Sequence, residues 1–385
     1  MAGNNQLAKH NHVPGISRFC NTMKETTTSE EVELIGAKLP EWAQGVYLRT
    51  GPGLFDLEEC TMHHLLDGYA ILTKFEIKFN RVILTKKYLN SDSYKRAIAA
   101  KKPVITEFAT GPSPDPNEGF FSRVKHTFSP ELTDNNSSNI IIIGKDVYTL
   151  GDSCFFHRID PENLETKERH DTNKLFKFNI HTAHPIPDSN GDLWNIGYTV
   201  FTGLKFHILK IPPGKTVSER FKKSKTIATV HSRWSGAMAS VHSFGVTDKF
   251  IVLVEQPFVV SAGKIAASIL KRDSVKEWMD WNEKERNRFV IVSKTGIVHS
   301  QEYLSIKPFH FLHVINAFED HNNQIIVDIN AYTSPSYMEA LYLSKLRADI
   351  VEISDPPQVL RFVIPIFEPH LKVENIHENT NLLTE

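Results

Sequence analysis

The sequence has few cysteines and almost no net charge, and each scarcity excludes a class of protein. Its 385 residues include three cysteines, an odd number at unpatterned positions, which excludes a disulfide framework and fits a reducing compartment. A net charge of −1 supplies no basic surface for phosphates, so nucleic acid is not an expected partner. The sequence also contains no apolar segment of signal-peptide length at its start and no apolar run of about 18 residues. We therefore expect a cytoplasmic protein.

Several enzyme motifs are missing as well. The chain has no His-Glu-x-x-His motif, no serine nucleophile elbow, no Walker loop and no dinucleotide glycine fingerprint. Its 19 glycines and 20 prolines are an average share, enough for many turns without low-complexity segments. The length suffices for one large β domain or two ordinary domains.

Short apolar runs rich in β-branched residues recur along the chain, with turn residues between them. The clearest expected strands are Tyr69–Ile77, Ile140–Ile143, Val147–Leu150, Asp192–Gly197, Phe250–Val254, Phe289–Val292, Ile325–Ile329 and Val359–Ile364. Helices do not alternate with them, so the pattern predicts an all-β sandwich, barrel or propeller, and periodicity alone does not choose among these. Residues 1–37 are polar and predict a flexible lead-in, followed by one domain over residues 38–385.

Two segments suggest surfaces other than a sheet. From Phe258 to Arg272, apolar residues recur at helical spacing and basic residues take the other face. Such a helix either lies at a membrane interface or packs against the core. The membrane interpretation assigns four membrane-facing residues: Phe258, Ile265, Ile269 and Leu270. A second candidate surface is the aromatic and basic segment Gly119–Phe128.

Three histidines lie next to expected strands and are candidate metal ligands: His184, His242 and His313. They are too far apart in the sequence for a zinc finger or a helix-borne pair, and their separation suits one ligand from each repeated β-unit. Coordination by histidine alone suits a first-row ion such as Fe²⁺ or Zn²⁺. Neutral imidazoles leave the charge of that ion uncompensated unless nearby carboxylates orient the rings.

These segments, with several others, resemble the carotenoid cleavage oxygenases, in particular the animal branch that includes the carotene dioxygenases and the retinoid isomerohydrolase of the retinal pigment epithelium. Each motif is moderately specific, and seven in the family's order are very specific. The resemblance extends from about Leu39 to about Phe367. The matching motifs are Tyr47–Gly53, His64–Gly68, Val104–Phe108, Thr182–Pro185, Val241–Gly245, His313–Asp320 and Tyr342–Arg347.

The resemblance implies a seven-bladed β-propeller with short helices on one face and Fe²⁺ on its axis. It implies four histidine ligands, of which His184, His242 and His313 match three. It also implies cleavage of a conjugated double bond of a carotenoid or apocarotenoid by O₂, giving aldehyde or ketone products such as retinal. Asp152 stands where the family has a glutamate behind one ligand; because it is one methylene shorter, we expect a longer or water-mediated hydrogen bond. A bilayer-dissolved substrate implies peripheral association with membranes.

The sequence departs from the family near its end, where the His-Gly segment with the fourth ligand does not occur. The surroundings of the late histidines His370 and His377 do not match it. We therefore expect a propeller with its last blades missing, as in a fragment or short isoform. Two other functions stay open: a retinyl-ester isomerohydrolase, disfavoured because Asn117 stands where that branch usually has cysteine, and a truncated isoform that binds carotenoid or retinoid without catalysis.

Overall fold

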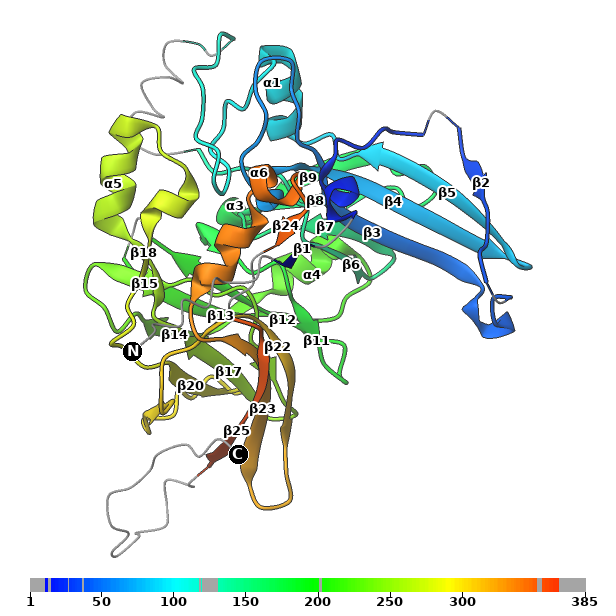
Figure 1. Cartoon of the computed structure of the whole chain (residues 1–385). Helices are drawn as coiled ribbons and strands as arrows, with labels where there is room; N and C mark the ends of the chain where they lie inside the picture. The colour runs from blue at the N-terminus through cyan, green and yellow to red at the C-terminus, as the bar shows by residue number, and fades with distance from the viewer. Residues whose placement is uncertain are drawn as a thin grey trace, which may run out of the picture.

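A computed structural model of the chain describes residues 11–12, 15–26, 28–36, 38–117, 119, 131–200, 203–351 and 355–366, with the backbone alone at residues 11, 12, 269 and 270. Over these residues the protein is mostly β with a few short helices, as the sequence predicts (Figure 1). None of the helices within these ranges is long and apolar enough to cross a membrane.

Five antiparallel sheets contain most of the strands, and each draws its strands from one stretch of the chain. The first has the order β2-β5-β4-β3: β2 (Glu30–Val32), β3 (Gly45–Leu54), β4 (Tyr69–Lys78) and β5 (Arg81–Tyr88). The second has the order β6-β7-β8-β9: β6 (Asn139–Ile143), β7 (Asp146–Leu150), β8 (Phe155–Ile159) and β9 (Thr166–Asp171). The third contains β10 (Ile180–His181), β11 (Ile186–Pro187), β12 (Leu193–Thr199), β13 (Lys205–Ile211) and β14 (Lys225–His231). The fourth contains β16 (Gly245–Val246), β17 (Phe250–Glu255), β20 (Arg288–Ser293) and β21 (Tyr303–Leu304). The fifth contains β22 (His310–Glu319), β23 (Gln324–Tyr332) and β25 (Gln358–Pro365).

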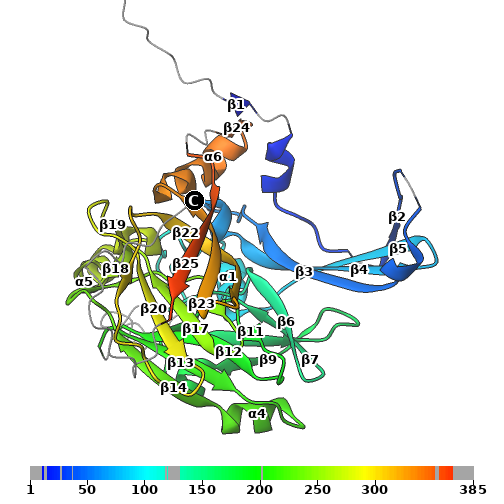
Figure 2. The same ribbon diagram turned by 90° about the horizontal axis from the view of Figure 1, so that it is seen from below.

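Two smaller sheets and the helices lie around this series. The smaller sheets are formed by β15 (Ala237–Ala239), β18 (Phe258–Ser261) and β19 (Met279–Trp281), and by β1 (Asn11–His12) with β24 (Ile350–Val351). The α-helices are α1 (Asp92–Ala100), α3 (Thr172–Phe176), α4 (Val217–Lys223), α5 (Ala262–Lys271) and α6 (Leu343–Leu346). The 3₁₀ helices are η1 (Ile16–Cys20), η2 (Glu41–Ala43), η3 (Leu65–Asp67), η4 (Val275–Trp278) and η5 (Pro335–Leu341). In Figure 1, α1, α5 and α6 lie toward the top of the molecule. In Figure 2, α4 lies at the lower edge, apart from these three helices.

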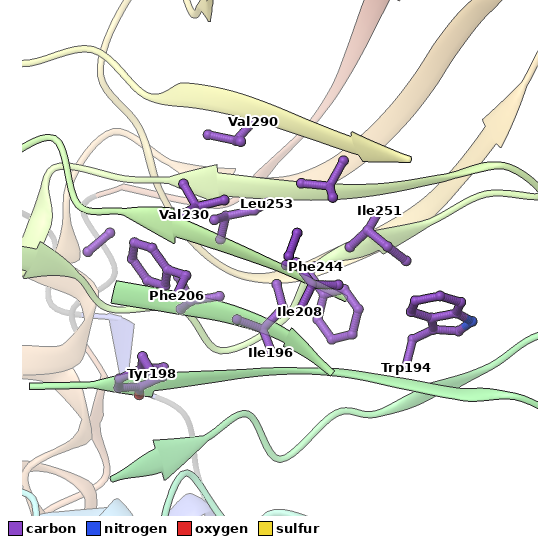
Figure 3. Packing of buried hydrophobic residues seen from close by; sticks show 14 of the residues in the cluster. Trp194, Ile196, Tyr198, Phe206, Ile208, Val230, Phe244, Ile251, Leu253 and Val290 are labelled. Atoms are coloured by element: carbon purple, nitrogen blue, oxygen red, sulfur yellow. The ribbon is translucent and has the colours of Figure 1, made fainter. Parts of the chain in front are cut away.

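Consecutive sheets pack face to face, and the strand β17 shows how. Its side chains alternate: Ile251 and Leu253 join a core shared with β12, β13 and β20, whereas Val252 and Val254 join a core shared with β22, β23 and β25. Figure 3 shows the first of these cores, in which Trp194, Phe206 and Phe244 pack among aliphatic side chains. Both faces of this sheet are therefore covered, which explains why β17 is a continuous apolar run rather than an alternation of apolar and polar residues.

The same packing joins the earlier sheets. Apolar residues of β7 and β8 pack against β12 and β13, and others pack against β4. Figure 2 shows the sheets in chain order beside one another, from β6–β9 through β12–β14 to β17 and β20. The first and last sheets of the series carry exposed apolar side chains, including Tyr47 and Val359, which are 55% and 68% exposed. The number of blades and the loss of the last ones stay predictions.

The expected strands are confirmed. The segment Gly51-Pro52-Gly53 lies within β3, at a register irregularity. Gly53 is required there by close packing, because a Cβ would lie 2.5 Å from the side chain of Ile71. The predicted lead-in also contacts the domain in its described parts: β2 pairs with β5, and Cys20 is buried.

The helix predicted from Phe258 begins four residues later. Residues Phe258–Ser261 form β18, because the β-branched Val259 and Val260 pair with both β15 and β19. The Ser261 side chain then accepts a hydrogen bond from Lys264 N–H and caps α5. Helix α1, which the strand pattern did not predict, starts with the same device: Ser91 caps it through Tyr94 N–H.

Candidate metal centre

Three different parts of the fold contribute the candidate ligands. His184 lies in the segment between β10 and β11, His242 lies between β15 and β16, and His313 lies within β22. The first two therefore lie in connections between strands. In a connection, the pleat of a strand does not determine the direction of a side chain. The structure brings all three together: each ring offers one ligand atom, and these atoms lie within 4.8 Å of one another.

A bulge in β22 determines the direction of His313. The pairing of β22 with β23 passes from Phe311 opposite Ala331 to Val314 opposite Ile329, so β22 has one extra residue at this point. A bulge of this kind bends the strand and re-aims a side chain that regular alternation would place elsewhere. His313 lies within the bulge.

The three rings approach one point from different directions. Nε2 of His184 lies 2.9 Å from Nε2 of His242. The ring centroids are 4.5, 5.0 and 4.8 Å apart, and the ring planes meet at 73°, 77° and 81°. Nearly perpendicular rings avoid stacking, which leaves their lone pairs free to converge.

A carboxylate fixes one of the rings. Asp152 Oδ2 lies 2.5 Å from His242 Nδ1, and Asp152 Oδ1 accepts a hydrogen bond of 2.9 Å from Ala183 N–H. The aspartate therefore contacts His242 directly, so the expectation of a longer or water-mediated bond is wrong. The second hydrogen bond explains the direct contact, because it holds the short side chain between the segments of His184 and His242. With its proton on Nδ1, His242 presents Nε2 toward His184.

The charges of these groups follow from their surroundings. Burial and the charge of His242 lower the pKa of His184 to about 4, and the same two causes lower the pKa of His313. Burial lowers the pKa of His242, but the charge and hydrogen bond of Asp152 outweigh it and raise that pKa. Partial loss of solvent raises the pKa of Asp152, but the charge and hydrogen bond of His242 and the Ala183 N–H lower that pKa by more, so the carboxylate stays ionised. At neutral pH, His184 and His313 are neutral imidazoles, the form that binds metal ions.

The residues fit a divalent first-row ion. Two nitrogen ligands in neighbouring positions at about 2.1 Å from one ion lie about 3 Å apart, close to the distance between the Nε2 atoms of His184 and His242. The set contains three imidazoles and no thiolate, which suits ions such as iron, zinc or cobalt. The carboxylate of Asp152 contacts the far side of the His242 ring, and its negative charge partly balances the charge of a 2+ ion.

Comparison with known proteins places the chain in a family. The profile of the family described as retinal pigment epithelial membrane protein (RPE65) matches residues 19–381. The β,β-carotene 15,15'-dioxygenase of Homo sapiens is 31% identical over 381 residues, covering 95% of this chain and 68% of that protein. The chain belongs to the RPE65 family of carotenoid oxygenases.

Two further relatives of the carotenoid oxygenase family have similar identity. The carotenoid isomerooxygenase of Galleria mellonella is 31% identical over 330 residues, covering 85% of this chain and 64% of that protein. The β,β-carotene 15,15'-dioxygenase of Gallus gallus is 32% identical over 345 residues, covering 86% and 65%. The chain thus spans about two thirds of the length of these relatives.

Solved structures show the same fold. A variant of the Synechocystis apocarotenoid oxygenase superposes with a TM-score of 0.71 at 20% identity, covering 93% of this chain and 71% of that one. The cobalt-substituted form of that enzyme gives a TM-score of 0.70 at 19% identity, covering 92% and 71%. The fold class predicted for this member of the carotenoid oxygenase family, a β-propeller, agrees with this similarity.

Two residues of the matching motifs that were not predicted as site residues position the candidate ligands. The Ser243 hydroxyl donates to Leu312 carbonyl and accepts from Val314 N–H, both at 2.7 Å, so it binds β22 on either side of His313. Thr182 donates to Asn195 at 2.7 Å and receives His184 N–H at 3.3 Å. Each is a small hydroxyl residue within two positions of a candidate ligand, and that adjacency is the one signal the sequence offers for them.

The predicted membrane-facing residues do not form a common exposed face. Phe258 and Ile265 are buried, at 8% and 6% exposure, because β18 is paired on both sides and Ile265 lies on the inner face of α5, whose other face is exposed at Lys264. For these two the prediction is wrong. The side chains of Ile269 and Leu270 lie outside the described residues, as do His370, His377 and nearly all of Gly119–Phe128.

Proposed function

We propose that this chain is a non-haem Fe(II) dioxygenase that cleaves a conjugated double bond of a carotenoid or apocarotenoid with O₂. Each carbon of the broken bond receives one oxygen atom, which gives two aldehyde or ketone products such as retinal or apocarotenals. The observation that carries the proposal is the convergence of His184, His242 and His313 in a chain whose relatives are named carotene dioxygenases.

The residues of this chain have defined tasks in that reaction. His184, His242 and His313 would hold the iron through their free ring nitrogens. Asp152 keeps the proton of His242 on Nδ1 and fixes the ring direction, and Ser243 holds the bulge that carries His313. When bound, the iron supplies the activation of O₂, which no side chain here provides. Three protein ligands leave coordination positions free for small molecules.

The partners and location are part of the same proposal. A carotenoid or retinoid and O₂ are the expected partners, and a substrate that dissolves in lipid favours a cytoplasmic protein in peripheral contact with membranes. This membrane contact does not rest on Phe258 or Ile265, because both are buried. It rests on the solubility of the substrate alone.

The test is to load the purified chain with Fe²⁺ under anaerobic conditions, add β-carotene in detergent and admit ¹⁸O₂. We expect aldehyde products, each labelled at its carbonyl before exchange with water. A His313→Ala variant should bind less iron and form less product. A His299→Ala variant is the matched control, because its partly buried ring packs on Phe250 and does not belong to the cluster of three histidines.

Other results would contradict the proposal in distinct ways. Bound but unchanged β-carotene in the iron-loaded protein would indicate a binding protein. Conversion of a retinyl ester to isomerised retinol, without cleavage of β-carotene, would indicate an isomerohydrolase. Equal iron content in wild type and the His313→Ala variant would show that this histidine is not a ligand.

A further inference from the structure

One fully buried histidine outside the metal centre has no hydrogen-bond partner. His310 begins β22, three residues before His313, and is 0% exposed. Among the described residues neither of its ring nitrogens has a partner, and the same holds for the hydroxyl of Tyr337. Buried polar atoms in native proteins are nearly always hydrogen-bonded, since an unsatisfied one costs the loss of its hydration. Three such atoms on two adjacent rings require an explanation.

The surroundings of His310 are aromatic. Its ring centroid lies 5.0 Å from that of Phe258 on β18, 6.4 Å from that of Trp281 on β19 and 5.5 Å from that of Tyr337 on η5. We call these four residues the aromatic box. Phe258 is buried, but Trp281 and Tyr337 are only partly buried, so their rings separate His310 from the surface. The apolar part of the box is therefore formed by Phe258 and Trp281, and its polar atoms belong to His310 and Tyr337.

The aromatic box is connected to the metal centre. Three residues of strand span about 10 Å, so His310 lies about that far along β22 from His313. Gln256 links the two regions: its side chain donates to Ser240 carbonyl and to Phe311 carbonyl and accepts from Phe311 N–H. A carotenoid bound with the middle of its chain at the histidine cluster has its end group several double bonds away. That distance is similar to the distance from the cluster to the aromatic box.

We propose that His310 and Tyr337 bind a hydroxyl group on the end ring of a carotenoid or apocarotenoid substrate, whose ring packs against Phe258 and Trp281. This inference rests on the proposed function and adds the class of substrate. A neutral imidazole has one N–H donor and one acceptor, and a tyrosine hydroxyl has both as well. A hydroxyl also donates and accepts, so it pairs with one ring nitrogen of His310 and with the hydroxyl of Tyr337 at the same time. A hydrocarbon ring satisfies neither.

Charged end groups fit this site less well than a hydroxyl. Burial lowers the pKa of His310 to about 3, with a smaller contribution from His242, so the ring is uncharged at neutral pH. The described contacts of the box include no cation that would balance a carboxylate. A neutral polar group avoids that cost, because it loses less hydration on burial than an ion does.

Binding to the metal-free chain tests this inference independently of turnover. The probes are β-carotene and its 3,3'-dihydroxy derivative, titrated in detergent with tryptophan fluorescence as the signal. We expect the dihydroxy compound to bind at least about fivefold more tightly, the effect of one net hydrogen bond. Tyr337→Phe, which removes a single oxygen atom, and His310→Phe should each abolish most of that preference.

The matched control is Tyr332→Phe. Tyr332 stacks on Tyr337 at 3.9 Å, but its hydroxyl is not among the buried atoms without partners, so its loss should leave the preference unchanged. Equal binding of both compounds to wild type, no binding of either, or a preference that survives both test variants would overturn the inference. Cleavage of β-carotene together with equal binding would leave the proposed function standing and reject only the role of the box.

Discussion

Replacement of Asp152 by asparagine tests the organisation of the metal centre most directly. The two oxygens of Asp152 accept hydrogen bonds from His242 Nδ1–H and from Ala183 N–H. Asparagine keeps one carbonyl oxygen but places an NH₂ group where the other oxygen was, so one donor then faces another donor. The substitution also removes the negative charge that raises the pKa of His242.

The structure sets the expected size of the effect. Loss of a group that orients a metal-binding histidine costs about 10-fold to 100-fold in metal affinity. Asp152 makes two charge-assisted hydrogen bonds, which favours the upper part of that range, but 37% of its side chain is exposed, which adds solvent screening. We expect about 30-fold weaker binding, equivalent to about 2 kcal/mol. Asp152→Glu keeps the charge and should stay within about threefold of wild type.

The assay is competition for Co²⁺ between the protein and a chelator, followed through the visible absorption of the bound ion. Asp280→Asn is the matched control, because it loses the same charge but Asp280 pairs with Lys264 on an exposed surface. Wild-type affinity in Asp152→Asn would refute the role of this carboxylate. An equal loss in Asp280→Asn would show that net charge, rather than the contact with His242, controls binding.

Two further predictions concern the scaffold. Gly197→Ala should destabilise the protein by about 2 kcal/mol in urea unfolding, because its Cβ would lie 2.1 Å from the buried ring of Phe178. The control is Gly51→Ala, whose Cβ meets nothing within 4 Å and which should have little effect. Equal losses of stability in the two variants would contradict this account. Hydrogen bonding to Arg347 lowers the pKa of Asp56 to about 2, so its stabilisation is complete above the ordinary pKa of 3.8 and is lost as the pH falls toward about 2. Asp56→Asn should therefore cost about 1 kcal/mol at neutral pH, after allowance for the 41% exposure of the side chain, and the difference from wild type should shrink between about pH 4 and pH 2. A difference that does not change with pH would exclude this ion pair as its source.

The sequence predicted the strands well because their signal is local. The run Ile251–Val254 is apolar at every position, and the structure shows that its sheet is covered on both faces. The candidate ligands were also accessible from the sequence, since each histidine stands in a short motif beside a strand. What these patterns encode is which residues are buried and which elements they form.

Features that depend on pairing between distant segments could not be predicted in this way. The strand β18 replaces the first turn of the expected helix because two other strands pair with it, and neither partner adjoins it in the sequence. The bulge at His313 depends on the register between β22 and β23. The hydrogen bond of Asp152 to His242 joins residues 90 positions apart, so its length could not be read from side-chain size alone.

The candidate metal centre is therefore a product of how the sheets stack. Asp152 follows β7 of the second sheet, His184 lies between strands of the third, His242 precedes the fourth and His313 belongs to the fifth. These four residues therefore belong to different sheets or to the segments beside them. The distances between them are fixed by the apolar packing between the sheets. They are also fixed by the side chains of Asp152 and Ser243, which form hydrogen bonds to neighbouring segments. A substitution in those apolar interfaces should consequently alter metal binding even when it lies far from any ligand, whereas a substitution on an exposed loop should not.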